Sequence, residues 1–434
     1  MERILEQAKA RGVEAEITVV SRERLPVRFA NNDMESLALE RTVDVILRVI
    51  HGGRIGLAAA SALEDGGDLL GRALATCPTG PEAAFEFPED SPSGSLGLFD
   101  SDLPDLPVQI MIEEGKRQMA AVRAMLGEDV ALKAELVRKV ERIRIANTAG
   151  LACEQQRTSF DQDLIAAFPG SGAGPWAEQK TVGFEPMDYG KIAYLARGFD
   201  WARRNSTPAT GRRQLLVAPS AMDAFLWRLE TAASGRSLID GVSVLENKVG
   251  ERLLDPRVTL WDKPHLRGHP GGRSFDDEGV ATQDRRVFDR GVFAGFLYSL
   301  ETAAQVHGAA STGNGYKQAR FAAGAAVHPR PQALRWTLDG GETDHEALIA
   351  AMRDGVILYT PLGAHSGNIV AGQFSVTVGV GYHVVNGEVV GRAMNTMVSG
   401  NVYDLFNRLA AISHDTNDDG LPWVLFDGVD IAGR

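Results

Sequence analysis

Cysteine is almost absent from this chain: Cys77 and Cys153 are the only two among 434 residues, and they lie in different segments. A disulfide framework is therefore not expected, and the composition suits a reducing compartment. The first residues, MERILEQAKARG, are charged and lack the apolar core of a secretory signal. The sequence also lacks any apolar run long enough to span a bilayer. We therefore expect a cytoplasmic protein that has no membrane partner.

Basic residues are also fewer than acidic ones. The chain has 45 lysine and arginine residues against 57 aspartate and glutamate residues, for a net charge of −12. A protein that binds duplex DNA needs a basic surface to displace the counterions of the phosphates, so this balance argues against direct nucleic-acid binding. What remains is an ordinary globular composition, 44% hydrophobic and 24% charged, in a chain long enough for two or three domains.

The periodicity of the hydrophobic residues predicts an α+β fold. Residues 1–77 form a small N-terminal α+β domain with an antiparallel meander, and residues 78–106, rich in proline and serine, form a linker or covering loop. Residues 107–212 form a central domain with α/β character. Residues 213–434 form a C-terminal β-rich domain with antiparallel hairpins.

Local patterns place particular elements within these domains. Two dipeptides that accept positive φ at both turn positions predict tight hairpins, Gly52-Gly53 and Asn386-Gly387. Apolar residues at helical spacing predict helices over four ranges: 65–76, 107–126, 221–234 and 401–411. Ser220 is the expected N-cap of the third helix, because its hydroxyl can accept an N–H from the first turn.

The stretch 274–315 holds the main candidate site. It begins with three adjacent carboxylates, Asp276, Asp277 and Glu278, and after a hairpin pattern it ends on a polar turn, Ser311-Thr312-Gly313-Asn314. Adjacent carboxylates can share a proton or bind a divalent cation, which makes the cluster a candidate for chemistry. The alternative is a solvated turn, since acids before a glycine commonly serve as turn formers and caps.

Histidine pairs at the spacing of a zinc site are the next candidates. His345-Glu346 is not followed by a second histidine three residues later. His265 and His269 have a four-residue spacing, but the prolines and glycines around them exclude a helix. We expect a surface loop there, with at most an adventitious metal. A strand–turn–helix G-x-S-x-G motif, which would indicate a serine hydrolase, is also lacking.

Four stretches of the second half together resemble the TldD/PmbA family, in its PmbA (TldE) branch. They are Ser274-Phe275-Asp276-Asp277-Glu278-Gly279-Val280, Ser311-Thr312-Gly313-Asn314, Thr360-Pro361-Leu362-Gly363-Ala364-His365-Ser366-Gly367-Asn368, and Met397-Val398-Ser399-Gly400-Asn401-Val402. The resemblance implies that these stretches supply groove or signature residues: Asp276, Asp277, Glu278, Ser311, Thr312, Asn314, His365 and Asn368.

Catalytic members of this family look like zinc metallopeptidases. Their H-E-x-x-x-H motif lies on a helix after a short buried strand, and a cysteine near the C-terminus completes the site. Here the corresponding range, 221–234, contains no histidine, and no cysteine follows Cys153. The resemblance therefore implies no catalytic residue, no metal ligand and no cofactor in this chain.

The resemblance further implies a partner. A PmbA-like subunit pairs with a TldD-like chain that holds the zinc, and the pair degrades or trims unfolded peptides in the cytoplasm. An extended peptide can be held by adding a strand to a sheet edge, where backbone pairing tolerates many sequences. The family's name carries a role in modulating DNA gyrase, but nothing in these residues supports direct DNA contact.

Two other functions stay open at this point. The chain can be a hydrolase in its own right, with an unusual site built from Asp276, Asp277, Glu278, and His365 or His383. It can also be a homodimeric scaffold that binds peptides without any catalytic partner.

Overall fold

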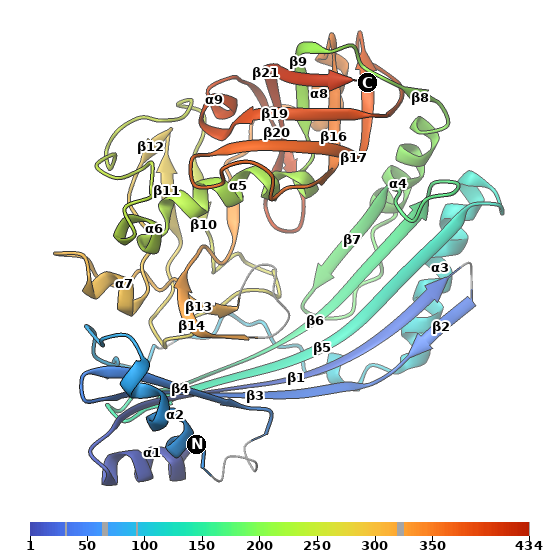
Figure 1. Cartoon of the computed structure of the whole chain (residues 1–434). Coiled ribbons are helices and arrows are strands. Elements are labelled where there is room, and N and C mark those ends of the chain that lie inside the picture. Colours follow the sequence, from blue (N-terminus) through green and yellow to red (C-terminus); the bar gives the residue numbers. More distant parts are fainter. Residues whose placement is uncertain (31–32, 63–67, 93, 319–324, 434) are drawn as a thin grey trace.

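The computed structural model describes residues 1–30, 33–62, 68–92, 94–318 and 325–433. A long curved sheet, here called the N-terminal sheet, lies below a compact body formed by residues 205–433, here called the C-terminal body (Figure 1). Helices α1 (Glu2–Ala10) and α2 (Leu69–Thr76) lie at one end of the sheet, and α3 (Val108–Leu126) and α4 (Tyr189–Trp201) lie at the opposite end (Figure 1). The described residues include no helix that is long and apolar enough to cross a membrane.

The N-terminal sheet is antiparallel throughout, in the order β4-β3-β1-β5-β6-β7, with β2 paired to β1. Its strands are β1 (Glu14–Ala30), β2 (Asp33–Leu37), β3 (Glu40–His51), β4 (Arg54–Ala60), β5 (Ala131–Asn147), β6 (Ala152–Ala167) and β7 (Trp176–Thr181). Strands β1 and β5 have 17 residues each and reach about 55 Å at ~3.3 Å per residue. Strands from the predicted domains 1–77 and 107–212 thus form one continuous sheet.

One face of this sheet is apolar and lies under helices. Along β1, Ile17 and Val19 pack with α1 (Glu2–Ala10) and α2 (Leu69–Thr76). Further along the same strand, Val27 and Phe29 pack with α3 (Val108–Leu126), and α4 (Tyr189–Trp201) joins that core. The prediction for α3 is confirmed; α2 begins at Leu69, and its predicted start lies in residues 63–67, outside the described part.

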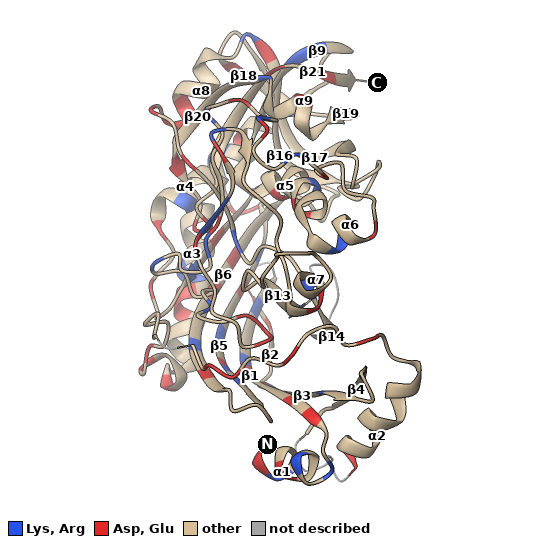
Figure 2. Ribbon diagram, turned by 90° about the vertical axis from the view of Figure 1, so that its left-hand side faces the viewer, with Lys and Arg blue, Asp and Glu red and all other residues tan. Residues whose placement is uncertain are grey.

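The other face of β1 looks toward the C-terminal body. It presents Glu16, Thr18 and Val20, and then Arg22 and Arg24. Charged residues of both signs lie along the long strands (Figure 2). The contact between the two parts therefore contains buried polar side chains as well as two apolar clusters, one around Val20 and Phe275 and the other around Phe168 and Leu216.

The C-terminal body has a sheet in the order β16-β9-β21-β19-β17-β18-β8, with β20 paired to β21, and β17 also pairs with β16, so the sheet curls back on itself. Its strands are β8 (Asn205–Ser206), β9 (Gly211–Val217), β16 (Asp354–Leu362), β17 (Gln373–Val385), β18 (Glu388–Ala393), β19 (Thr396–Asn401), β20 (Leu409–Thr416) and β21 (Pro422–Gly433). Helix α5 (Pro219–Ala233) is almost wholly buried against it.

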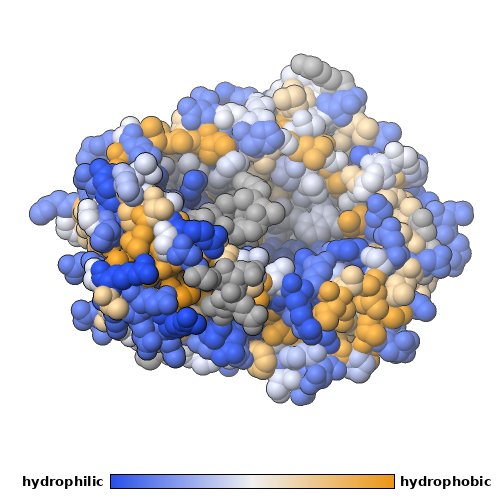
Figure 3. Space-filling view, turned by 60° about the horizontal axis from the view of Figure 1, so that its bottom comes forward, coloured by the Kyte–Doolittle hydropathy of each residue, from blue (hydrophilic) through white to orange (hydrophobic). Residues whose placement is uncertain are grey.

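Smaller elements complete the C-terminal body. They are α6 (Gly235–Ile239), β10 (Leu260–Asp262), β11 (Arg285–Asp289), β12 (Val292–Phe293), α7 (Leu300–Ala304), β13 (Gly315–Gln318), β14 (Ala325–Pro331), β15 (Trp336–Leu338) and α8 (His345–Ala351). In Figure 1 the hairpin of β13 and β14 lies nearest the N-terminal sheet. In the view of Figure 3 the surface is hollowed near its middle, and hydrophilic residues border much of the hollow.

The two predicted hairpin turns are confirmed, whereas the predicted length of one helix and the predicted N-cap of another are wrong. Gly52, Gly53, Asn386 and Gly387 all have positive φ in their hairpins, as predicted. The predicted helix 401–411 is only α9 (Val402–Phe406), because the following residues form β20 and pair with β21. Helix α5 is also capped differently from the prediction: Ala218 is the N-cap, and the Ser220 hydroxyl donates to the Tyr359 carbonyl.

Candidate functional site

The three adjacent acids are buried rather than solvated. Asp276 and Glu278 are 0% exposed and Asp277 is 7% exposed. The Asp276 carboxylate accepts backbone N–H groups of Glu278 at 2.9 Å, Val280 at 3.0 Å and Gly315 at 2.8 Å. It therefore folds its own turn and attaches that turn to the start of β13.

The other two acids each accept hydrogen bonds from an arginine side chain and from a backbone N–H group. Asp277 accepts from the Arg273 guanidinium at 2.7 Å and from the backbone N–H of Lys317 at 2.7 Å. Glu278 accepts from the Arg48 guanidinium at 2.7 Å and from the backbone N–H of Leu300 at 2.7 Å. Both oxygens of each of the three carboxylates thus accept hydrogen bonds from the protein.

Arg48 and Glu278 belong to a buried network that joins the N-terminal sheet to the C-terminal body. Arg48 on β3 also donates to Glu16 on β1 at 3.1 Å. Lys317 on β13 donates to Glu16 at 2.8 Å and to Thr18 at 2.7 Å. Burial would raise the pKa of Glu16, but the charges of Arg48 and Lys317 outweigh burial and hold that pKa below its ordinary value.

The polar turn at 311–314 is part of the same framework. The Thr312 hydroxyl accepts the Tyr298 N–H at 2.8 Å and donates to the Asn314 side chain at 2.7 Å, while the Ser311 hydroxyl donates to the Tyr298 carbonyl at 3.4 Å. The buried Asn314 amide donates to the Asp262 carboxylate at 2.6 Å. Burial raises the pKa of Asp262 to about 7, even though the Arg335 N–H and Asn314 lower it.

The raised pKa of Asp262 gives a prediction for the pH dependence of stability. An unfolded aspartate has a pKa of about 3.9, so the folded state binds this proton more tightly. The stabilisation is fully present below pH ~4 and is lost as pH rises toward 7. We expect the wild-type minus Asp262→Asn difference in unfolding free energy to fall by about 1.4 kcal/mol per pH unit over that range, in urea titrations. A difference that stays constant with pH contradicts this assignment.

The remaining candidates lie elsewhere. His365 and Asn368 are exposed in the loop between β16 and β17, where the Asn368 side chain accepts the Ala371 N–H at 3.1 Å. His383 lies on β17 between the Ser206 hydroxyl at 2.7 Å and Asp354 at 3.2 Å. Within the described part of the chain, no hydrogen bond or ion pair connects these three residues to the acids at 276–278.

Helix α5 carries a buried arginine. The Arg228 guanidinium donates to the carbonyls of Gln373 at 2.6 Å, Ser366 at 2.8 Å and Ala364 at 2.9 Å, and also to Ala224 within the helix. It thereby holds the loop between β16 and β17, and burial lowers its pKa. In the described residues no group of three or more His, Cys, Asp or Glu side chains is arranged to hold a metal ion.

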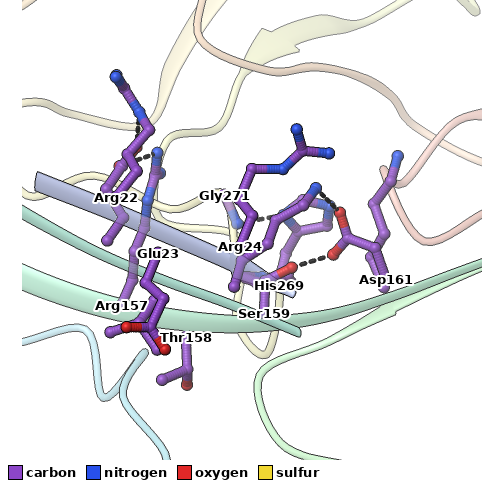
Figure 4. A pocket seen from close by; sticks show the side chains of 14 residues that line it. Arg22, Glu23, Arg24, Arg157, Thr158, Ser159, Asp161, His269 and Gly271 are labelled. Atoms are coloured by element: carbon purple, nitrogen blue, oxygen red, sulfur yellow. Dashed lines mark hydrogen bonds and ion pairs between the residues drawn. The ribbon is translucent and has the colours of Figure 1, made fainter. Parts of the chain in front are cut away.

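A cavity of about 300 Å³ lies between the polar face of the N-terminal sheet and the loop at 269–271 (Figure 4). Arg22, Arg157 and His269 are among its lining residues. His269 is 7% exposed, so the surface loop predicted for it is wrong: its ring lies 2.9 Å from Arg335 and 3.1 Å from Asp419. Sequence spacing could not reveal this, because Asp419 lies 150 positions further along.

Two more cavities, of about 350 and 240 Å³, lie along β7 and the start of α5. They share Trp176, Glu178, Pro219, Ser220 and Asn417. These two cavities and the first one all lie between the N-terminal sheet and the C-terminal body. No local sequence pattern indicated them, because the walls come from segments far apart in the chain.

The outer edge of β7, at the end of the N-terminal sheet, faces this space. Side chains form hydrogen bonds with some of the backbone groups along that edge. The Tyr359 hydroxyl donates to the Trp176 carbonyl at 2.8 Å, and the Lys191 ammonium donates to the Glu178 carbonyl at 2.9 Å. The Lys180 N–H donates to Asp418 at 3.1 Å. A peptide strand that adds to this edge has to displace these groups, which favours contacts through side-chain cavities instead.

Comparison with known proteins places the fold. Residues 210–433 match the family model for the PmbA/TldA metallopeptidase C-terminal domain, and residues 15–76 match that for PmbA/TldA metallopeptidase domain 1. Metalloprotease PmbA of Escherichia coli O157:H7 is 22% identical over 95% of this chain and 90% of its own length.

Two solved structures have the same fold. TldE from Thermococcus kodakarensis superposes with a TM-score of 0.88 at 22% identity and covers 100% of both chains. A Thermotoga maritima protein, named for a proposed role as a modulator of a DNA gyrase, superposes with a TM-score of 0.84 at 25% identity and covers 99% of both chains. The match of the C-terminal family model to more than half of the sequence is decisive, and the chain belongs to the TldD/PmbA family.

Proposed function

We propose that this chain is a subunit of a cytoplasmic metalloprotease complex and does not itself hold the catalytic metal. The zinc belongs to a TldD-like partner chain, and the complex degrades or trims unfolded peptides. Family membership supports the link to proteolysis. The environment of α5 supports the assignment of the zinc to the partner chain.

The observation that carries the proposal is the position of Arg228. Catalytic relatives place zinc ligands on the helix that corresponds to α5, whereas here the inward side of that helix bears a fully buried guanidinium. Its donors are directed at the carbonyls of Ala364, Ser366 and Gln373. A fixed positive charge on this helix disfavours the binding of a divalent cation nearby.

The acids at 276–278 support a structural role rather than a second catalytic centre. All three are buried and bonded to backbone N–H groups, and two of them are also paired with arginines. A general acid or a metal ligand has to present a free oxygen to a substrate or an ion. We infer that this stretch holds the two parts of the chain at a fixed angle, which sets the width of the space where a peptide is held.

Reconstitution tests the proposal. The chain is purified alone and after co-expression with a TldD-like chain that contains H-E-x-x-x-H, and each sample is incubated with an unfolded peptide. We expect cleavage only by the co-purified pair, and loss of cleavage when the glutamate of the partner's motif is replaced by glutamine. Cleavage by the chain alone contradicts the proposal, as does a stable homodimer that does not capture the partner.

A further inference from the structure

The cavity of about 300 Å³ between the N-terminal sheet and the loop at 269–271, here called the basic cavity, is rich in cations. Five basic side chains from four strands line it: Arg22 and Arg24 on β1, Lys139 on β5, Arg157 on β6 and Lys180 on β7. The acids in the lining are Glu23, Glu141 and Asp161. Five cations against three carboxylates leave an excess of two positive charges, in a chain whose net charge is −12. A cavity lined by positive charge concentrates anions.

Strand pairing places these side chains in two rows across the sheet. In the first row Glu141 lies between Arg22 on one neighbouring strand and Arg157 on the other. In the second row Arg24 lies directly opposite Lys139. Like charges directly opposite each other on adjacent strands are destabilising, so an anion between them relieves the repulsion.

Arg157 is the least compensated of the five cations. Among the described residues its one hydrogen-bond or ion-pair partner is Glu141, 2.5 Å away. Arg22 shares that carboxylate at 2.7 Å and also has Asp44 at 2.6 Å. Burial lowers the pKa of Arg157 by more than Glu141 raises it, and repulsion by Arg273 lowers that pKa further. At Arg22 the two carboxylates outweigh burial and raise the pKa. The Arg157 side chain is 20% exposed and therefore still reaches the cavity that it lines.

The acids on β3 that pair with Arg22 and Arg24 lie outside the lining. Their side chains are well exposed, 36% for Asp44 and 42% for Glu40. Water and salt screen such pairs, so these acids offset little of the charge inside the cavity. The two lysines of the lining are paired with acids, Lys139 with Asp161 and Lys180 with Glu178. The arginines are therefore the cations that a ligand engages first.

The facing wall, which the C-terminal body contributes, adds no carboxylate to the lining. It is made by His269, Pro270 and Gly271 (Figure 4). The His269 Nδ1 accepts the Gly271 N–H at 2.9 Å, and the Nε2 lies 3.1 Å from Asp419. Burial lowers the pKa of this histidine, which keeps the ring neutral near pH 7. An anion thus meets arginines on one side and a neutral wall on the other.

The donors suit a carboxylate best. A guanidinium offers paired N–H groups whose spacing matches the two oxygens of a carboxylate. Because Glu141 and Asp161 also line the cavity, a monoanion is favoured over a dianion such as phosphate.

We propose that the basic cavity binds a carboxylate group of a peptide through Arg157 and Arg24. This inference rests on the proposed role in handling peptides, and it names the group by which the chain holds them. A peptide offers a carboxylate at its C-terminus or on an acidic side chain. The cavity is built from this chain's own residues, so binding requires no partner subunit.

The test is isothermal titration calorimetry of the purified full chain at low ionic strength. The probes are acetyl-Gly-Gly-Ala with a free C-terminal carboxylate, the same peptide as its amide, acetyl-Gly-Asp-Gly-amide, and inorganic phosphate. We expect a carboxylate peptide to bind about tenfold more tightly than the neutral amide, and to bind more weakly as salt is added.

The two carboxylate peptides distinguish the source of the group. Tighter binding of acetyl-Gly-Gly-Ala assigns the cavity to the end of a peptide chain, and tighter binding of the aspartate peptide assigns it to an acidic side chain. Equal binding of all three peptides, tighter binding of phosphate than of either carboxylate peptide, or no binding of any peptide overturns the inference.

Three variants test the residues. Arg157→Gln should weaken binding of the carboxylate peptide about tenfold, because a charged donor is lost. Arg24→Gln should weaken it about threefold, and this side chain is 40% exposed, so its replacement does not threaten folding. Arg142→Gln is the matched control: it removes the same charge from β5, but Arg142 pairs with Glu154 outside the lining. Equal affinities in all three variants refute the assignment. The proposed function is judged separately, by cleavage with the partner, and survives if only carboxylate binding fails.

Discussion

Replacing Arg48 by methionine is expected to lower the free energy of unfolding by about 3–5 kcal/mol. The Arg48 side chain is 1% exposed and bonds Glu16 and Glu278, both of which are fully buried. Without the guanidinium, Glu278 keeps, among the described residues, only the Leu300 N–H as a hydrogen-bond partner, and Glu278 is 0% exposed. The variant also loses the contacts of the guanidinium with the rings of Phe85 and Phe87, at 5.0 and 5.2 Å.

Urea unfolding measures this loss, and Arg41→Met is the matched control. Arg41 lies on the same strand, β3, and pairs with Glu23, but its side chain is 71% exposed. Removal of that surface pair should cost less than about 1 kcal/mol. Similar losses in the two variants contradict the claim that a buried network joins the N-terminal sheet to the C-terminal body.

Replacing Arg228 by methionine should cost about 3 kcal/mol, because several buried carbonyls lose a charged donor at once. These carbonyls belong to the loop between β16 and β17, so we also expect faster cleavage of residues 363–372 by a nonspecific protease. Arg212→Met is the control, since Arg212 pairs with Asp430 on the surface at 3.4 Å. If the loop keeps its protease resistance in Arg228→Met, the guanidinium does not hold it.

Some parts of the fold follow from short-range rules and were predictable. Gly52-Gly53 and Asn386-Gly387 made hairpins because positive φ at both positions is a local requirement. The end of the chain was harder, because Leu409 and Ile412 have helical spacing yet pair with Phe426 and Val424 in a sheet. Pairing with a distant strand overrode the local period.

The face of β1 toward the C-terminal body shows why the joint was missed. Apolar residues alternate with polar ones along this strand, and the polar set reads as solvent-exposed in the sequence. In the structure Glu16 and Thr18 instead bind Lys317, which is about 300 positions away. Periodicity identifies which residues share a face, but it does not reveal what covers that face.

The candidate site was predictable in part. The resemblance singled out the acids at 276–278, but the role of Glu278 depends on Arg48, which is 230 positions away. The cavity of about 350 Å³ beside β7 has no sequence signature, because Trp176, Tyr194, Tyr359 and Trp423 converge only when the two parts of the chain come together. Such cavities depend on tertiary structure and not on local spacing.

The central claim, that this chain works without a metal of its own, is tested most directly by metal analysis of the purified protein. The chain and its complex with the TldD-like partner are dialysed against buffer that contains zinc, and the bound metal is measured by mass spectrometry. We expect the chain alone to retain far less than one zinc per molecule and the complex to retain one zinc per partner chain. One tightly bound zinc per molecule in the isolated chain contradicts the claim.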